Sequence, residues 1–174
     1  MRSTTTTSLS LLLLAPTALC DFTIYAAGVG GTGITDNLNG WQVYPKTAGV
    51  IKCDIALEWI WRQGPDVSGG QYGVRCKYSE KGKTCSRAGA GDKIEVLEFN
   101  TKPRAGDTTR THFTYYADRG GAMIDLNGKN LGTCRPVPNE HFYCGGSIGR
   151  TEGTKMLDCT SALVANDFRK PNNS

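Results

Sequence analysis

The sequence predicts an α+β fold in which one helix packs on an antiparallel sheet, with an N-terminal hairpin and three stapling disulfides. Three observations lead to this prediction. Six cysteines remain once a leader is removed, one segment has the signals of a helix, and several short segments rich in β-branched and aromatic residues are bounded by Gly, Pro or Asp. A chain of 174 residues is long enough for one domain with its own core. We therefore expect a single secreted domain over residues 21–174.

The first 20 residues have the pattern of a cleavable signal peptide. The apolar run 9–15 is too short to span a bilayer, and Ala18-Leu19-Cys20 follows it as a cleavage site. A lipoprotein would keep and acylate Cys20, but Leu19 stands where that pathway needs a small residue. We expect cleavage after Cys20 and free secretion to the extracellular space, with no membrane association, because no second hydrophobic segment follows.

The cysteine count supports the same cleavage site, because removing Cys20 from seven cysteines leaves an even number. The remaining six are Cys53, Cys76, Cys85, Cys134, Cys144 and Cys159. No Cys-x-x-Cys pair occurs and the chain has only two histidines, so we expect disulfides and no metal site. About fifteen pairings are formally possible for six cysteines. We favour Cys76 with Cys85, Cys134 with Cys144, and Cys53 with Cys159.

The N-terminal part of the domain predicts a hairpin. Residues 22–25 and Trp41-Gln42-Val43-Tyr44 have strand character, and the glycine-rich segment 28–40 connects them. Residues 28–33 match the G-x-G-x-x-G pattern of dinucleotide sites, but turn residues follow where that site needs a helix N-terminus. We therefore expect a loop and no cofactor.

The helix is predicted over residues 55–62. Asp54 can cap its N-terminus, and Gly64-Pro65 ends it. Trp59 and Trp61 indicate a helix packed against a sheet, and Cys53 would fasten its start.

Beyond the helix, the alternation of apolar and polar residues predicts strands. These strands cover residues 71–78, 94–100, 112–117, 122–126 and 155–159. Asn127-Gly128 predicts a two-residue hairpin turn, in which both residues accept positive φ.

Composition and motifs exclude several enzyme classes. The chain has no G-x-S-x-G nucleophile motif and no H-E-x-x-H zinc motif. The formal net charge is +4, and the basic stretch 75–93 is typical of a solvated loop.

One helix before an antiparallel sheet stapled by disulfides resembles the small secreted microbial ribonucleases of the T1 and ribotoxin type. The resemblance covers the chain from the helix onward. It implies Glu98 as general base and His112 as general acid, with Arg110 or Arg119 holding the phosphate and His141 as the second histidine. The chain departs from that pattern because the strand before Glu98 carries no histidine. RNA is a partner only under this alternative.

The whole pattern resembles the small cysteine-rich secreted effectors of plant-associated filamentous fungi. This resemblance depends on three sequence segments, Trp41-Gln42-Val43-Tyr44, Gly73-Val74-Arg75-Cys76 and residues 114–121, together with the leader and six cysteines. The resemblance implies action on a host by binding, such as blocking a protease or masking a wall component.

We therefore expect a monomeric binder rather than an enzyme, acting as a virulence protein on a host extracellular protein. A papain-like cysteine protease of a plant host is the most concrete target. Two loops are candidate inhibitory surfaces, residues 28–40 with the following Trp41 and residues 135–142, since rigid loops lose little entropy on binding. Their contact residues would be Gly30, Gly31 and Trp41 in the first loop, and Pro138, His141 and Phe142 in the second.

Overall fold

The fold was analysed in a computed structural model of the whole chain. The structure describes residues 20–30, 38–46, 51–56, 60–81, 83, 85–101, 111–138, 140–145 and 149–168. Of the predicted leader, residues 1–20, only Cys20 is among the described residues; Gly31 and Arg110 lie outside them. None of the helices in the described part of the chain has the length and hydrophobicity that crossing a membrane requires.

The protein is mostly β, so the α+β prediction is wrong. The strands are β1 (Cys20–Gly30), β2 (Leu38–Pro45), β3 (Trp61–Arg62), β4 (Gly73–Tyr78), β5 (Ile94–Asn100), β6 (His112–Tyr116), β7 (Ala122–Asp125), β8 (Asn130–Pro136), β9 (His141–Gly145) and β10 (Arg150–Ser161). The helices in the described residues are all short: α1 (Cys53–Ala56) and the 3-10 turns η1 (Gly91–Lys93), η2 (Ala117–Arg119) and η3 (Ala165–Phe168).

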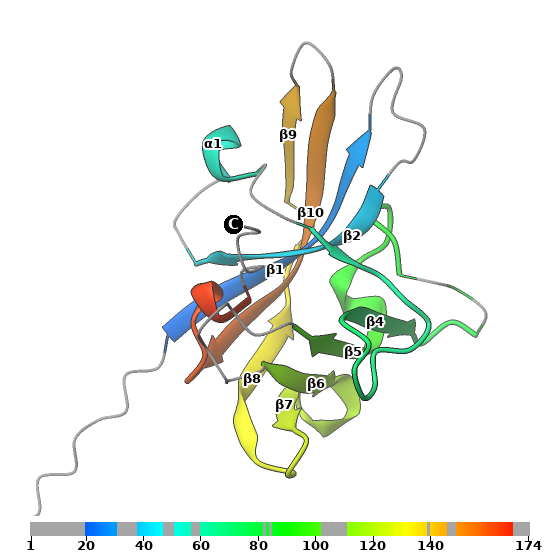
Figure 1. The fold of residues 1–174 in the computed structure, drawn as a ribbon, viewed down its shortest axis with the longest axis vertical. Coiled ribbons are helices and arrows are strands. Elements are labelled where there is room, and N and C mark those ends of the chain that lie inside the picture. The colour runs from blue at the N-terminus through cyan, green and yellow to red at the C-terminus, as the bar shows by residue number, and fades with distance from the viewer. Residues whose placement is uncertain are drawn as a thin grey trace, which may run out of the picture.

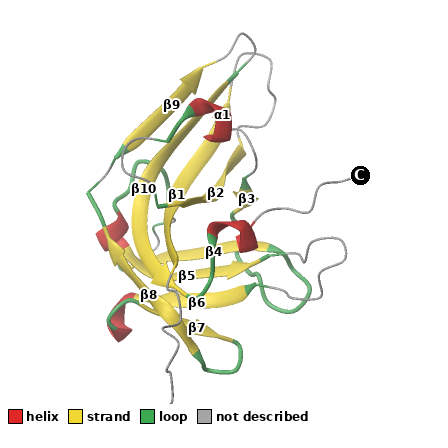
Figure 2. Cartoon of the chain, turned by 90° about the vertical axis from the view of Figure 1, so that its left-hand side faces the viewer, coloured by secondary structure: helices red, strands yellow, loops and turns green. Residues whose placement is uncertain are grey.

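The strands form one antiparallel sheet that curls into a nearly closed barrel (Figures 1 and 2). Its order is β3-β2-β1-β10-β8-β7-β6-β5-β4, and β9 pairs separately with β10. The two ends of this path meet, because Gln63 bridges Val74 and the Gly64 N–H donates to the Val74 carbonyl over 2.9 Å. This contact closes the wall between the first and last strands.

Aromatic side chains fill the barrel interior. Phe99 on β5 and Phe113 on β6 are fully buried and stack with ring centroids 5.4 Å apart. Phe168 of η3 packs edge-on against both rings and is itself fully buried. The alternation of strand side chains then places Glu98 on the outer face.

Four strands, β1, β2, β9 and β10, continue beyond the barrel as an extended sheet (Figure 1). A second apolar cluster lies on this extension, where Tyr25, Tyr44 and Phe142 contact one another edge to face. Helix α1 contacts β9, and its Cys53 is bonded to Cys144 in this cluster.

The predicted helix over 55–62 is wrong. Among the described residues of the segment 53–62, only Cys53–Ala56 is helical, and Trp61 belongs to β3. Trp61 pairs with Trp41 of β2, and its indole N–H donates to the Phe168 carbonyl. Pairing and burial of Trp61 stabilise an extended backbone that the helical spacing of the local sequence did not reveal.

The six cysteines from Cys53 to Cys159 all form disulfides, but only one predicted pair is confirmed, Cys76 with Cys85. The other two bonds join Cys53 to Cys144 and Cys134 to Cys159. Cys134 and Cys159 lie directly opposite each other on β8 and β10, with Cα atoms 4.0 Å apart. That pairing depends on β8 lying beside β10, whereas the sequence indicated only that a strand follows the Asn127-Gly128 turn.

Both predicted hairpins are present, but the first has longer strands than predicted, since β1 runs to Gly30 and β2 begins at Leu38, and the second differs in turn geometry. β1 pairs with β2, and β7 pairs with β8 across the Asn127-Gly128 turn. In the second turn only Gly128 has a positive φ, of 80°. The Asp125 N–H donates to the Lys129 carbonyl, so three residues form the loop instead of two. The Asp125 carboxylate accepts the N–H groups of Asn127 and Lys129 and holds the loop closed.

Disulfide mapping tests this arrangement directly. Trypsin leaves Cys134 and Cys144 in one peptide, because the bond after Arg135 precedes a proline, so a second cut after Glu140 is needed. After both digestions under non-reducing conditions, we expect the Cys134 peptide to be linked to that of Cys159. A Cys134–Cys144 link, or alkylation of any of the six cysteines in the native protein, would contradict the fold.

Candidate functional site

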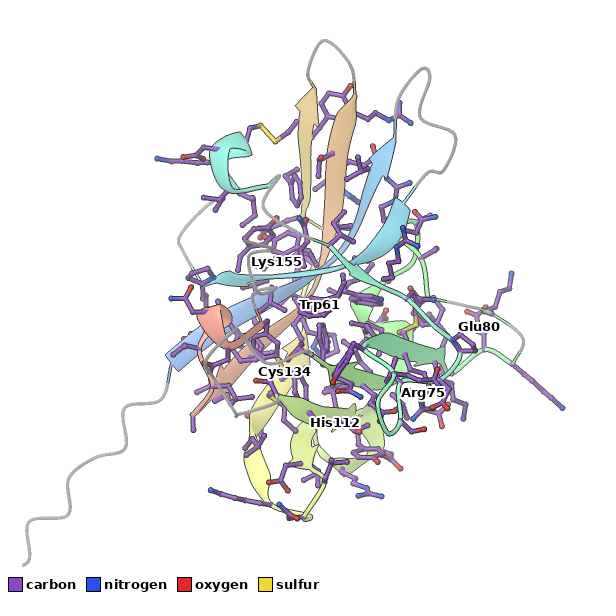
Figure 3. All side chains as sticks on the ribbon, in the orientation of Figure 1. Trp61, Arg75, Glu80, His112, Cys134 and Lys155 are labelled. Carbon is purple, nitrogen blue, oxygen red and sulfur yellow. A yellow bond between two sulfur atoms is a disulfide. The ribbon has the colours of Figure 1, made fainter. Side chains whose placement is uncertain are left out.

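The first candidate site is a charged cluster on the outer face of the barrel, formed by Arg75, Glu98 and His112 and called here the glutamate cluster. These residues come from the neighbouring strands β4, β5 and β6. One Glu98 oxygen lies 2.8 Å from the His112 Nε2, and the other lies 2.8 and 2.7 Å from the Nε and a terminal nitrogen of Arg75. Figure 3 labels Arg75 and His112 on this part of the barrel.

The electrostatics of the glutamate cluster favour a charged carboxylate. Burial raises the pKa of Glu98, but hydrogen bonds from His112 and Arg75 and the Arg75 charge outweigh it, so its pKa lies below the ordinary value. The His112 side chain is only 5% exposed and that of Glu98 12%, whereas Arg75 reaches solvent. The cluster therefore joins three strands through charge-assisted hydrogen bonds.

The structure brings together two of the residues expected for a ribonuclease, Glu98 and His112. Arg75 occupies the position expected of an arginine partner, while Arg110 lies outside the described residues. His141 lies on β9 and takes no part in the cluster. Both Glu98 oxygens already have partners and the side chain is only 12% exposed, so little of the carboxylate is accessible to a substrate hydroxyl.

The second candidate site is a cleft of about 1050 Å³ on the extended part of the sheet. Side chains of β1, β2, β9 and β10 line it, together with residues 63–65, 75–76 and 85–88. The Cys76–Cys85 disulfide holds the last of these segments against the sheet. Recesses at the mouth of a barrel are common ligand sites.

One row of residues crosses the cleft from strand to strand, and we call it the cleft row. Tyr143 on β9 lies opposite Glu152 on β10, Glu152 opposite Gly28 on β1, and Gly28 opposite Asn39 on β2. Strands are spaced about 4.8 Å apart, so the row spans about 14 Å. All four residues belong to the cleft face of the sheet.

Arg87 lies across the middle of the cleft row. Its guanidinium fills the space above Gly28, where an added Cβ would come within 2.6 Å of it, and it pairs with the Glu152 carboxylate. The backbone of Arg87 is held as well, because Thr154 donates its hydroxyl to the Arg87 carbonyl over 2.8 Å. His141 Nδ1 lies 2.9 Å from the same hydroxyl. A larger residue at position 28 would therefore displace the guanidinium from its place above the strand.

Sequence reasoning missed Arg87, Glu152 and Tyr143 as site residues. The alternation Thr151-Glu152-Gly153-Thr154 beside Phe142-Tyr143 was the available signal, since polar residues recurring on one strand face indicate a solvated surface. The described residues contain no group of three or more His, Cys, Asp or Glu side chains able to hold a metal ion.

The residues expected to contact a protease are spread over different environments. Trp41 is fully buried and Phe142 is 3% exposed, so neither ring can contact a partner in this conformation. Gly30 is half-buried, Pro138 and His141 are exposed, and Gly31 lies outside the described residues.

Replacing the central carboxylate tests the structural role of the glutamate cluster. We expect Glu98→Gln to lower the free energy of unfolding at about pH 6 by roughly 1.5 to 3 kcal/mol, because charge-assisted hydrogen bonds are lost. The folded-state pKa of Glu98 lies below that of the unfolded chain, so its contribution is present above the ordinary glutamate range and disappears as the pH falls through the lowered value. Urea unfolding at about pH 6 and about pH 3 should show the difference between wild type and variant shrinking.

Glu95→Gln provides the matched control on the same strand. Glu95 pairs with Lys77 over 3.0 Å, but its side chain is 40% exposed. We expect this exposed pair to contribute less than about 1 kcal/mol at either pH. Equal effects of the two substitutions would show that the glutamate cluster adds nothing to ordinary surface pairing.

Comparison with known proteins identified no relative of this chain. No protein-family model, curated protein or solved structure matches the chain. The functional argument therefore depends on the cleft and the glutamate cluster themselves.

Proposed function

We propose that the protein is a secreted, effector-like binding protein that holds its target in the cleft. The observation that carries this proposal is the recess of about 1050 Å³ lined by convergent polar side chains on a disulfide-fastened frame. Three disulfides form readily in oxidising, extracellular surroundings, which supports secretion together with the leader pattern. A rigid frame lowers the entropy lost on binding.

The concave shape of the site favours a target that binds inside the cleft. An inhibitor that projects a loop into a protease groove needs exposed anchors, and Trp41 and Phe142 are both buried. The cleft instead presents exposed groups around a depression, among them Tyr143, Asn39 and His141. We therefore propose that a host molecule docks into this chain, and that no loop of this chain inserts into a protease groove.

A ribonuclease is the second candidate, favoured by the 2.8 Å contact between Glu98 and His112. Two features of the glutamate cluster weigh against it. Glu98 and His112 bind each other directly, although a base and an acid must each reach the substrate, and His112 is almost completely buried. The helix-and-sheet architecture that carried the resemblance is also replaced by a barrel.

A photocrosslinker placed in the cleft tests the binding proposal. With Tyr143 replaced by benzoylphenylalanine, irradiation in host extracellular fluid should give a defined covalent adduct. The same replacement at Tyr72, a 45% exposed tyrosine outside the cleft lining, is the matched control. Adducts of equal yield and pattern from both positions, or no adduct from Tyr143, would refute the cleft as the binding site.

An activity assay separates the two candidates. We expect the purified protein to leave single-stranded RNA intact over hours at neutral and mildly acidic pH, because Glu98 and His112 are engaged with each other. RNA cleavage that disappears in Glu98→Gln while persisting in Glu95→Gln would establish the ribonuclease instead.

A further inference from the structure

The cleft row assigns a chemical class to the ligand. We propose that the cleft binds a neutral oligosaccharide, with the Tyr143 ring as a stacking platform and the groups beside it as hydrogen-bonding partners for sugar hydroxyls. This inference rests on the proposed function and goes beyond it by naming the ligand chemistry.

The charge balance of the cleft favours a neutral ligand. Its two arginines already have acidic partners, since Arg87 pairs with Glu152 and Arg75 with Glu98. A polyanion would have to compete with a carboxylate at both positions, and Glu152 would repel it. A neutral polar molecule is not repelled by Glu152. It can bind the donors and acceptors of these side chains that the ion pairs do not use.

Tyr143 supplies the apolar platform that sugar rings require. The side chain is 65% exposed although large aromatic residues are usually buried, and it belongs to the cleft lining. An added Cβ on Gly145 would lie 3.2 Å from the Tyr143 ring, so the ring rests against bare backbone. The aliphatic C–H face of a sugar stacks on such a ring, and tyrosine offers this surface with few rotamers to immobilise.

The polar groups of the cleft match the hydroxyl pattern of a sugar. Arg87 and Glu152 lie side by side, so one hydroxyl can donate to the carboxylate while its neighbour accepts from the guanidinium. Asn39 offers both a donor and an acceptor at the far end of the row. The His141 Nδ1 contacts Thr154, and its second ring nitrogen, Nε2, is a further hydrogen-bonding group. Both donors and acceptors are thus available along the row.

The shape of the cleft favours a linear chain over a peptide strand. The row from Tyr143 to Asn39 spans about 14 Å, which suits a short run of sugar rings. An extended peptide usually binds by adding to a free strand edge, whereas this wall is formed by the faces of four paired strands. Backbone pairing is therefore unavailable to a peptide that lies over β1 and β10 in the middle of the row, and among the described strands of this wall the outer edge of β9 is where a peptide could add.

Calorimetric titration with defined oligosaccharides tests the inference. The probes are short linear neutral oligomers of β-linked glucose, N-acetylglucosamine, mannose and xylose, with an oligogalacturonate as the anionic probe. We expect at least one neutral oligomer to bind with micromolar affinity and to bind more tightly than the oligogalacturonate. Tyr143→Ala should weaken it at least about tenfold, while Tyr143→Phe, which keeps the ring, should stay within about threefold.

Tyr72→Ala is the control for a general loss of exposed aromatics, and we expect it to leave affinity unchanged. Binding of the oligogalacturonate alone, or equal loss in Tyr143→Ala and Tyr72→Ala, would overturn the inference. If no oligosaccharide binds but the crosslinker at Tyr143 captures a protein, the ligand class is wrong and the cleft remains a binding site. If neither experiment gives binding, both proposals fail.

Discussion

The pairing of β1 with β10 is the constraint on which the rest of the molecule depends. The two strands pair from Cys20 to Gly30 and belong to both the barrel and its extension. Their register shifts once, because Ile24 lies opposite Leu157 and Tyr25 opposite Lys155, which leaves Met156 as an extra residue. A single inserted residue reverses which side chains of a strand face each side of the sheet.

This reversal separates the core from the cleft. Along β1, side chains of the same sheet face line first the barrel interior and then the cleft. Along β10, the bulge shifts by one residue which side chains lie on that face. Below the bulge Leu157 fills the core, and above it Thr154 and Glu152 line the cleft. Lys155 consequently turns to the opposite face, where it pairs with Asp158. Without the bulge, the alternation would have placed Lys155 in the cleft instead of Thr154.

Local sequence patterns predicted several strands, missed β3 and β9, and predicted the tertiary contacts poorly. The alternation in residues 94–100 and the turn at Gly128 are local signals, and both elements lie where expected. The segment around Trp61 was misassigned because its strand is stabilised by Trp41, a distant residue whose proximity the helical spacing could not indicate. Glu98 and His112 could be expected to meet because they lie on consecutive antiparallel strands, but the cleft combines four strands whose order requires the full topology.

The cleft is held in shape before any ligand arrives, and this follows from how Arg87 is fixed. The Cys76–Cys85 disulfide anchors the segment that carries Arg87, and Gln63 donates its amide to the Cys85 carbonyl over 3.3 Å. Downstream, an added Cβ on Gly91 would come within 2.0 Å of the Met156 carbonyl, so only glycine lets this segment pack against the bulge of β10. The guanidinium therefore needs little reorganisation to meet a ligand, and more of the contact energy remains available for affinity. A binding surface of exposed polar side chains on a small domain depends on such fixation, because mobile side chains would lose much of that energy in becoming ordered.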